Sequence, residues 1–149
     1  MKRDMDLIRV ILMDIEGNEN INGKFTISDA DFGATGADRT ALQYHLRLLM
    51  DAGYIEGKDL LQSGKNDPRM DVHKMLIEEG APIMITRMTW DGHDFLDTVR
   101  DSKVWEKTKE ALKGVGGVGI DTIKDVAKEI GKTVINHQVK KHTGIDLGL

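Results

Sequence analysis

The segment from Asp38 to Ile55 constrains the fold of this 149-residue chain more than any other feature. At about 100° per residue, four of its side chains share one helical face and form the predicted core side. These side chains are Leu42, His45, Leu46 and Leu49. Asp38 is placed to cap the helix, and Gly53 is placed to end it in a left-handed conformation. Tyr54 and Ile55 then start an extended segment, so the sequence predicts a packed helix that leads directly into a strand.

Similar patterns predict elements on both sides of this segment. Apolar spacing predicts a helix over residues 4–16, and a short strand is expected at Phe25–Ile27. Residues 28–37 are rich in turn-forming residues and show no clear period. Ile83–Met88 has the pattern of a strand. Thr89 then caps a helix over Trp90–Val99, and helical spacing resumes as far as Lys113.

The predicted order is therefore helix, short strand, irregular stretch, helix, strand, long loop, strand and helix. This order is typical of an α+β winged helix, in which an amphipathic helix closes the core and a two-stranded hairpin follows. The loop of the hairpin is the wing, and here it corresponds to residues 62–82. Within that loop, the pattern fits a short helix after Pro68 as well as a strand over Val72–Ile77, and both stay open.

Three blocks of sequence carry a resemblance to known families. They are MKRDMDLIR at 1–9, YHLRLLMDAGYIEG at 44–57 and TRMTWDGHDFLDTVRDSKVW at 86–105. In general pattern the chain resembles bacterial winged-helix regulators, and more closely an uncharacterised family of small bacterial and prophage proteins. The resemblance covers about residues 1–113. It implies a winged-helix fold and a bacterial or phage origin, but no activity. The long loop at 62–82 and the missing second helix at 28–37 depart from the pattern.

The C-terminal third has a different organisation. We expect a winged-helix domain at 1–101 and a helical extension at 102–149, with a glycine-rich hinge at 114–119 and an amphipathic helix at 120–141. The apolar seam of that helix follows a heptad pattern and comprises Ile120, Ile123, Ala127, Ile130 and Val134. Such a seam either docks within its own chain or pairs with another copy. A homo-oligomer, and a dimer in particular, is the expected assembly.

The leading functional hypothesis is a non-enzymatic DNA-binding regulator of bacterial or phage origin. Its partner would be double-stranded DNA. Polar side chains of the helix that begins at Asp38 and basic side chains of the wing would contact it. The predicted contacts are Arg39, Thr40, Gln43, Tyr44, Arg47, Lys65 and Arg69. Charge opposes this hypothesis, because residues 1–101 carry 12 basic and 19 acidic side chains.

The alternative hypothesis is a winged-helix module that binds a protein, for example a phage-encoded modulator of a host factor. That module would use the same helix face or the 120–141 stripe. Residues 102–149 carry 9 basic and 6 acidic side chains, and the opposite charge balance of the two parts suggests different roles.

Patterns typical of enzymes are weak in this chain. Asp91, His93, Asp94 and Asp97 cluster around one turn, and His93 and Asp97 share a helix face. A metal site on that pair still requires a third ligand and an open position. Acidic residues near the N-terminus of a helix are explained more simply by the helix dipole. The glycines of GVGGVG match a dinucleotide motif, but a predicted helix precedes them where a strand is required. We therefore expect no catalytic residue, no metal and no cofactor. Trp90 and Trp105 are expected to be packing anchors, and His45 a hydrogen-bonded core residue.

Composition sets the remaining limits. The chain has no cysteine, which excludes disulfides and thiol catalysis and fits a reducing compartment. No apolar run approaches the roughly 20 residues that a membrane-spanning helix needs. The first residues lack the apolar region of a secretory signal, so a cytoplasmic location is expected.

Overall fold

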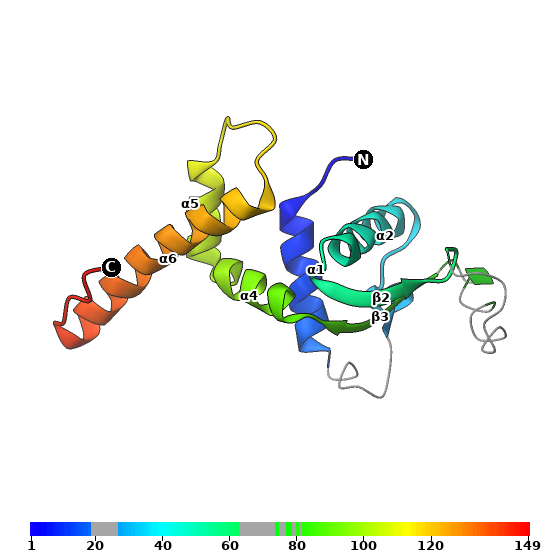
Figure 1. Ribbon diagram of the computed structural model, residues 1–149, viewed down its shortest axis with the longest axis horizontal. Helices are drawn as coiled ribbons and strands as arrows, with labels where there is room; N and C mark the ends of the chain where they lie inside the picture. Colours follow the sequence, from blue (N-terminus) through cyan, green and yellow to red (C-terminus); the bar gives the residue numbers. More distant parts are fainter. Residues whose placement is uncertain (19–26, 63–73, 75–76, 79, 81) are drawn as a thin grey trace. The chain divides into compact units, whose positions relative to one another are not determined.

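The computed structural model describes residues 1–18, 27–62, 74, 77–78, 80 and 82–149 (Figure 1). The chain separates into two compact units, residues 1–93 and 94–149. In the described part of the chain, five α-helices and one 3-10 helix accompany a small antiparallel sheet. The predicted α+β class is confirmed.

The first unit begins with α1 (Met5–Gly17), one residue later at each end than predicted. Asp4 is its N-cap, because Oδ1 accepts hydrogen bonds from the backbone N–H groups of Asp6 and Leu7 at 3.0 and 3.1 Å. The apolar stripe of α1 is buried as predicted. Its members are Ile8, Ile11, Leu12 and Ile15.

The second helix of this unit, α2 (Gly36–Asp51), packs against α1. Its predicted core side is confirmed, since Leu42, His45, Leu46 and Leu49 are all buried. The prediction of Asp38 as N-cap is wrong. Thr35 occupies that position, and Asp38 lies in the first helical turn, where its carboxylate favours the positive end of the helix dipole.

The end of α2 agrees with the sequence prediction. Gly53 has φ +74°, which is the left-handed conformation expected of it. The Gly53 N–H donates to the Met50 carbonyl at 3.0 Å, and the Tyr54 N–H donates to the Leu49 carbonyl at 2.9 Å. This pair of bonds satisfies carbonyls at the helix end and turns the chain into the next strand.

The sheet has three strands in the order β1-β3-β2, all antiparallel. They are β1 (Ile27–Ser28), β2 (Ile55–Asp59) and β3 (Ile83–Met88). The register pairs Ile55 with Met88 and Asp59 with Ile83, so β2 and β3 form the predicted hairpin. A 3-10 helix, η2 (Asp29–Phe32), fills part of the stretch that showed no period. A single turn of this kind is too short to produce a repeating apolar pattern.

The hairpin leads into α4 (Trp90–Val99) through a close backbone approach at Gly92. A Cβ atom at Gly92 would clash with the carbonyl oxygen of Tyr54 and lie 2.6 Å from the Cγ of Met88. The position therefore requires glycine. The predicted cap is present, because the Gly92 N–H donates to Oγ1 of Thr89 at 3.1 Å.

The second unit contains α5 (Ser102–Ala111) and α6 (Ile120–Thr143), which pack against each other. Asp101 separates α4 from α5, because its carboxylate accepts from the N–H groups of Lys103 and Val104 at 2.8 and 3.0 Å and so starts a new helix. The buried side chains of the pair are Val104, Trp105 and Thr108 on α5 and Ile123 and Ala127 on α6. Among the described residues, no helix combines the length and the apolar character needed to cross a bilayer.

Candidate functional site

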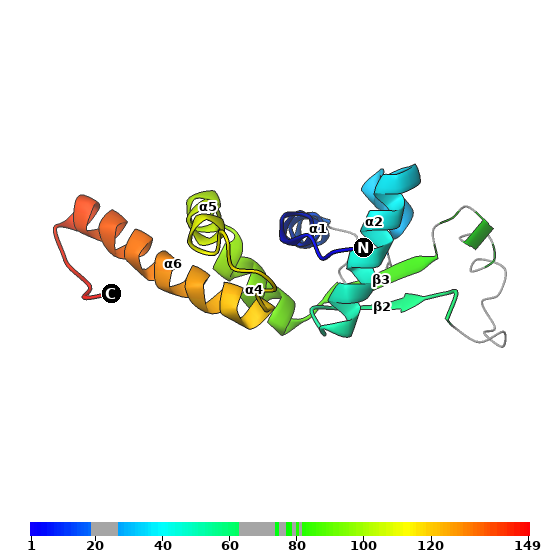
Figure 2. The same ribbon diagram turned by 90° about the horizontal axis from the view of Figure 1, so that it is seen from above.

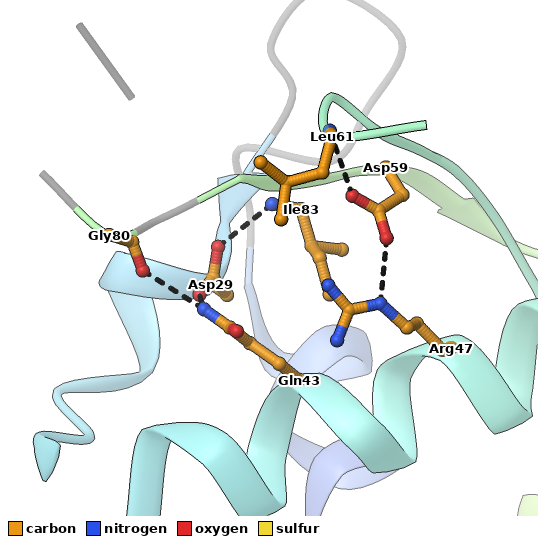
Figure 3. Close-up of polar contacts among 7 residues, drawn as sticks. All are labelled: Asp29, Gln43, Arg47, Asp59, Leu61, Gly80 and Ile83. Carbon is orange, nitrogen blue, oxygen red and sulfur yellow. Dashed lines mark hydrogen bonds and ion pairs between the residues drawn. The ribbon is translucent and has the colours of Figure 1, made fainter. Parts of the chain in front are cut away.

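The side chains predicted to contact DNA on α2 do not share one environment. Gln43 and Arg47 lie on the side of the helix that faces the base of the β2–β3 hairpin (Figure 3). Thr40 and Tyr44 lie on the outward side, and Arg39 lies near the start of the helix. The two groups therefore lie in different surroundings.

Gln43 connects α2 to both η2 and the end of the long loop. Its Nε2 donates to Oδ2 of Asp29 at 2.6 Å and to the carbonyl oxygen of Gly80 at 2.9 Å (Figure 3). The Asp29 carboxylate is fully buried, and its Oδ1 accepts from the backbone N–H of Ile83 at 3.0 Å. Gln43 thus helps to satisfy a buried carboxylate that also fixes the first residue of β3.

Arg47 connects α2 to β2, as Gln43 connects α2 to the start of β3 through Asp29. Its Nε lies 2.6 Å from Oδ2 of Asp59, the last residue of β2, and the Asp59 side chain is 7% exposed. Oδ1 of Asp59 accepts from the Leu61 N–H at 3.0 Å (Figure 3). Next to this pair, the Leu60 N–H donates to the carbonyl of Pro82 at 2.8 Å.

These contacts hold the two ends of the long loop beside each other and beside α2. We call the set Asp29, Gln43, Arg47 and Asp59 the wing-base network. The contacts of Gln43 and Arg47 to DNA stay a prediction. The structure adds an intramolecular role for both, which helical spacing could not show because their partners come from distant parts of the chain.

The outward side of α2 comprises residues that neither the core nor the wing-base network uses. They are Ala37, Thr40, Ala41, Tyr44, Leu48 and Asp51. Thr40 Oγ1 donates to the Gly36 carbonyl at 3.3 Å, and the Tyr44 ring meets the His45 ring edge-on at 5.2 Å. Arg39 Nε donates to the Ala34 carbonyl at 3.1 Å. None of the six outward residues is basic.

His45 is a hydrogen-bonded core residue, as predicted. Its Nε2 accepts from the backbone N–H of Asp4 at 2.8 Å, and its Nδ1 lies 2.7 Å from the Ala41 carbonyl. This pattern fits the neutral ring with the proton on Nδ1. His45 therefore links the start of α1 to α2.

The predicted wing contacts Lys65 and Arg69 lie outside the described residues. Lys74, which is described, is exposed and lies 3.8 Å from Glu78.

Trp90 differs from its prediction as a packing anchor. It is 84% exposed, whereas Trp105 is 3% exposed and confirms the prediction for that residue. Helical spacing carried the signal, because Phe95, Leu96 and Val99 define a face that lies opposite Trp90. Thr89 fixes the backbone beside Trp90, since its N–H donates to the Tyr54 carbonyl at 3.0 Å and its Oγ1 to the Gly53 carbonyl at 2.6 Å.

The acidic residues around α4 take part in ion pairs. Nδ1 of His93 lies 3.6 Å from Oε1 of Glu16, and Oδ2 of Asp94 lies 2.7 Å from Nζ of Lys124. The hydrogen bond from Lys124, together with its positive charge, holds the pKa of Asp94 below its ordinary value. Among the described residues, no cluster of three metal-ligating side chains occurs.

The glycine-rich segment at 114–119 follows α5 and precedes α6. A helix therefore stands where a dinucleotide-binding motif requires a strand, in agreement with the sequence interpretation. Of the predicted oligomerisation seam, Ile123 and Ala127 are buried on the side where α6 packs against α5. The others, Ile120, Ile130 and Val134, are half-buried.

Comparison with known proteins gives a family without a described activity. A family model described as "Hypothetical protein (DUF2513)" matches residues 2–119. An uncharacterised protein from Haemophilus influenzae is 31% identical over 139 residues, which are 93% of this chain and 99% of the relative. No solved structure matches the chain.

Proposed function

The chain belongs to the DUF2513 family of hypothetical proteins, and we propose that its first part is a winged-helix module that binds a partner protein without catalysing a reaction. The order α1-β1-η2-α2-β2-β3 supports the winged-helix assignment, with η2 as a shortened second helix between α1 and α2. The β2–β3 hairpin follows α2 directly, and its loop takes the place of the wing.

Trp90 is the observation that carries the proposal. Tryptophan normally buries about 150–250 Å² of surface, yet this side chain is 84% exposed at the first residue of α4. Tryptophan is also among the residues that contribute most to binding at protein interfaces. Its backbone is fixed by the Thr89 hydrogen bonds to Gly53 and Tyr54. Trp90 is thus presented on a rigid element, which limits the conformational entropy lost on binding.

Charge favours a protein partner over duplex DNA. Affinity for DNA comes largely from lysine and arginine contacts with phosphates. The outward side of α2 carries no basic residue, and Arg47 is paired with Asp59. Arg87 on β3 is likewise paired with Glu56 on β2. A surface of this kind suits a partner with an apolar patch that can cover an aromatic ring.

The test is affinity capture with the full chain as bait and quantitative mass spectrometry as readout. We expect the wild type to retain a specific partner and Trp90→Ala to lose it. Ile145→Ala is the matched control, because Ile145 is also an exposed apolar residue at 60% exposure and lies in the C-terminal tail. If Trp90→Ala retains the same proteins in the same amounts as the wild type, the proposal is wrong.

A DNA-binding regulator is the second candidate, and the position of α2 before the hairpin favours it. In that case Thr40 and Tyr44 would contact bases, and Lys65 and Arg69 would contact phosphates. Fluorescence anisotropy with a random duplex pool at low salt tests this candidate. It requires binding that weakens steeply with salt and falls in Tyr44→Ala. Absence of binding at low salt eliminates it.

A further inference from the structure

The last helix, α6, is longer than the helix that covers it. At about 1.5 Å per residue, the 10 residues of α5 span about 15 Å and the 24 residues of α6 about 36 Å. Both views show α6 running past the end of α5 (Figures 1 and 2). Ile123 and Ala127 in its first half are buried, whereas Ile135 in its second half is 52% exposed. The second half therefore lacks the packing that normally stabilises a short helix in water.

A groove of about 330 Å³ begins where this cover ends. Small and apolar side chains line it along its length, among them Val104 on α5 and Ala127, Val134 and Ile135 on α6. Gly131 also lines the groove, and nothing lies within 4 Å of the place where its Cβ would be. The groove therefore has room for side chains from outside.

The two walls of the groove carry opposite charges. Asp97 and Asp101 lie on the wall formed by α4 and the start of α5, and Lys128 and Lys132 lie on the α6 wall. Arg100 pairs with Asp97 at 2.8 Å and Glu129 pairs with Lys132 at 2.9 Å, so the net charge of the two walls comes from Asp101 and Lys128. The groove thus combines an apolar centre with one acidic and one basic edge. A molecule that fills the groove therefore needs an apolar centre, a basic edge to face the acidic wall and an acidic edge to face the basic wall.

The C-terminal tail of the same chain is held elsewhere. The Leu147 N–H donates to Oδ1 of Asn136 at 2.9 Å, and Lys140 Nζ lies 3.6 Å from Oδ2 of Asp146. Asn136 and Lys140 lie roughly 160° around the helix from Gln138, which lines the groove. The tail is therefore fixed to the opposite side of α6.

We propose that a second copy of this chain fills the groove, so that the protein forms a two-fold dimer with parallel α6 helices. A two-fold interface brings the same patch of both copies together. If the axis runs along the groove, the acidic wall of each copy faces the basic wall of the other. If the axis runs across the groove, acidic wall meets acidic wall. Charge therefore selects the first arrangement, which makes the α6 helices parallel. The proposal does not depend on Trp90 or on the outward side of α2.

Cysteine cross-linking tests this geometry directly, because the chain has no cysteine of its own. With parallel helices, Gln138 of one copy lies opposite Gln138 of the other. We expect Gln138→Cys in the full chain to give a covalent dimer with a short bismaleimide. Ile145→Cys, on the side away from the groove, should give no covalent dimer under the same conditions. Equal cross-linking of both variants, or none in Gln138→Cys, overturns the proposal.

Light scattering over a range of protein concentrations gives the independent test. The wild type should have the mass of a dimer, and Ile135→Glu should have that of a monomer with an unchanged circular dichroism spectrum. Ile145→Glu is the control and should stay dimeric. Asp97→Lys and Lys128→Glu should each weaken the dimer at least tenfold, and their combination should restore it. A monomeric wild type, a dimeric Ile135→Glu variant or a combination that restores nothing overturns the proposal.

Discussion

The helices α2 and α6 differ in what contacts the sides that the sequence predicted to bind a partner. On α2, two polar side chains that were predicted to face a partner, Gln43 and Arg47, bind other parts of the same chain. On α6, two members of the apolar seam that was predicted to pair with another copy, Ile123 and Ala127, are buried, and the other three are half-buried. Helical spacing therefore identifies the faces of a helix correctly, but whether a face binds its own chain depends on the segments that return to it.

The largest expected effect is on the free energy of unfolding, when a buried side chain of α2 and an exposed side chain of α6 are each truncated. Leu46 on α2 is fully buried, and Ile135 on α6 is 52% exposed. Leu46→Ala should lower the free energy of unfolding by about 2–5 kcal/mol, because it removes buried methyl groups and leaves a cavity. Ile135→Ala, measured by urea denaturation at a concentration where the chain is monomeric, should change it by less than about 0.5 kcal/mol.

The difference in stability loss between Leu46→Ala and Ile135→Ala becomes smaller if other parts of the same chain pack on the second half of α6. Ile135→Ala would then cost more than about 1 kcal/mol at every protein concentration. A cost that appears only at high concentration supports the dimer, because association stabilises the folded chain by mass action.

The next effect concerns the wing-base network. Gln43→Ala removes a hydrogen bond to the buried Asp29 carboxylate and should lower stability by about 1–3 kcal/mol. Thr40→Ala, on the outward side of the same helix, is the control and should change stability by less than about 0.5 kcal/mol. Equal losses in the two variants would mean that the Gln43 contact contributes nothing specific. Chemical denaturation of both variants decides between these outcomes.

Most of the packed elements could be predicted from the sequence. The apolar stripes of α1 and α2 and the cap at Thr89 depend on neighbours within one or two helical turns. The signals for them are therefore local, and so is the signal for Gly53, because its left-handed conformation is set by the helix end that it follows.

The candidate site could be predicted only in part, because its contacts are distant in sequence. Gln43 meets Gly80 across 37 residues, and Asp29 meets Ile83 across 54. No periodicity reports such a contact. Trp90 is a different case, since helical spacing places it opposite the buried Phe95, Leu96 and Val99, and the general preference of tryptophan for interiors does not hold at this position.

A smaller effect is expected from the other half of the wing-base network. Arg47 and Asp59 form an ion pair at 2.6 Å, in which Asp59 is nearly buried and the Arg47 side chain is 31% exposed. A double-mutant cycle with Arg47→Ala and Asp59→Asn should give a coupling free energy of about 1 kcal/mol, measured by urea denaturation. A coupling near zero would leave Arg47 available for the contact to DNA that the sequence predicted.

The smallest effect concerns the ion pair that anchors the first half of α6. The hydrogen bond and charge of Lys124 keep the pKa of Asp94 below its ordinary value. Because the folded-state pKa is the lower one, the pair stabilises the fold above the unfolded pKa of about 3.9. This contribution is lost as the pH falls through the folded-state pKa. The Asp94 side chain is 47% exposed, so solvent screening limits the contribution to about 0–1 kcal/mol. The stability difference between wild type and Asp94→Asn, measured from pH 7 to pH 3, should therefore shrink at the acid end. In a Lys124→Met background, the two curves should converge much less, because only the weaker attraction of Lys128 remains. If they converge there as much as in the wild-type background, the Asp94 carboxylate does not depend on Lys124.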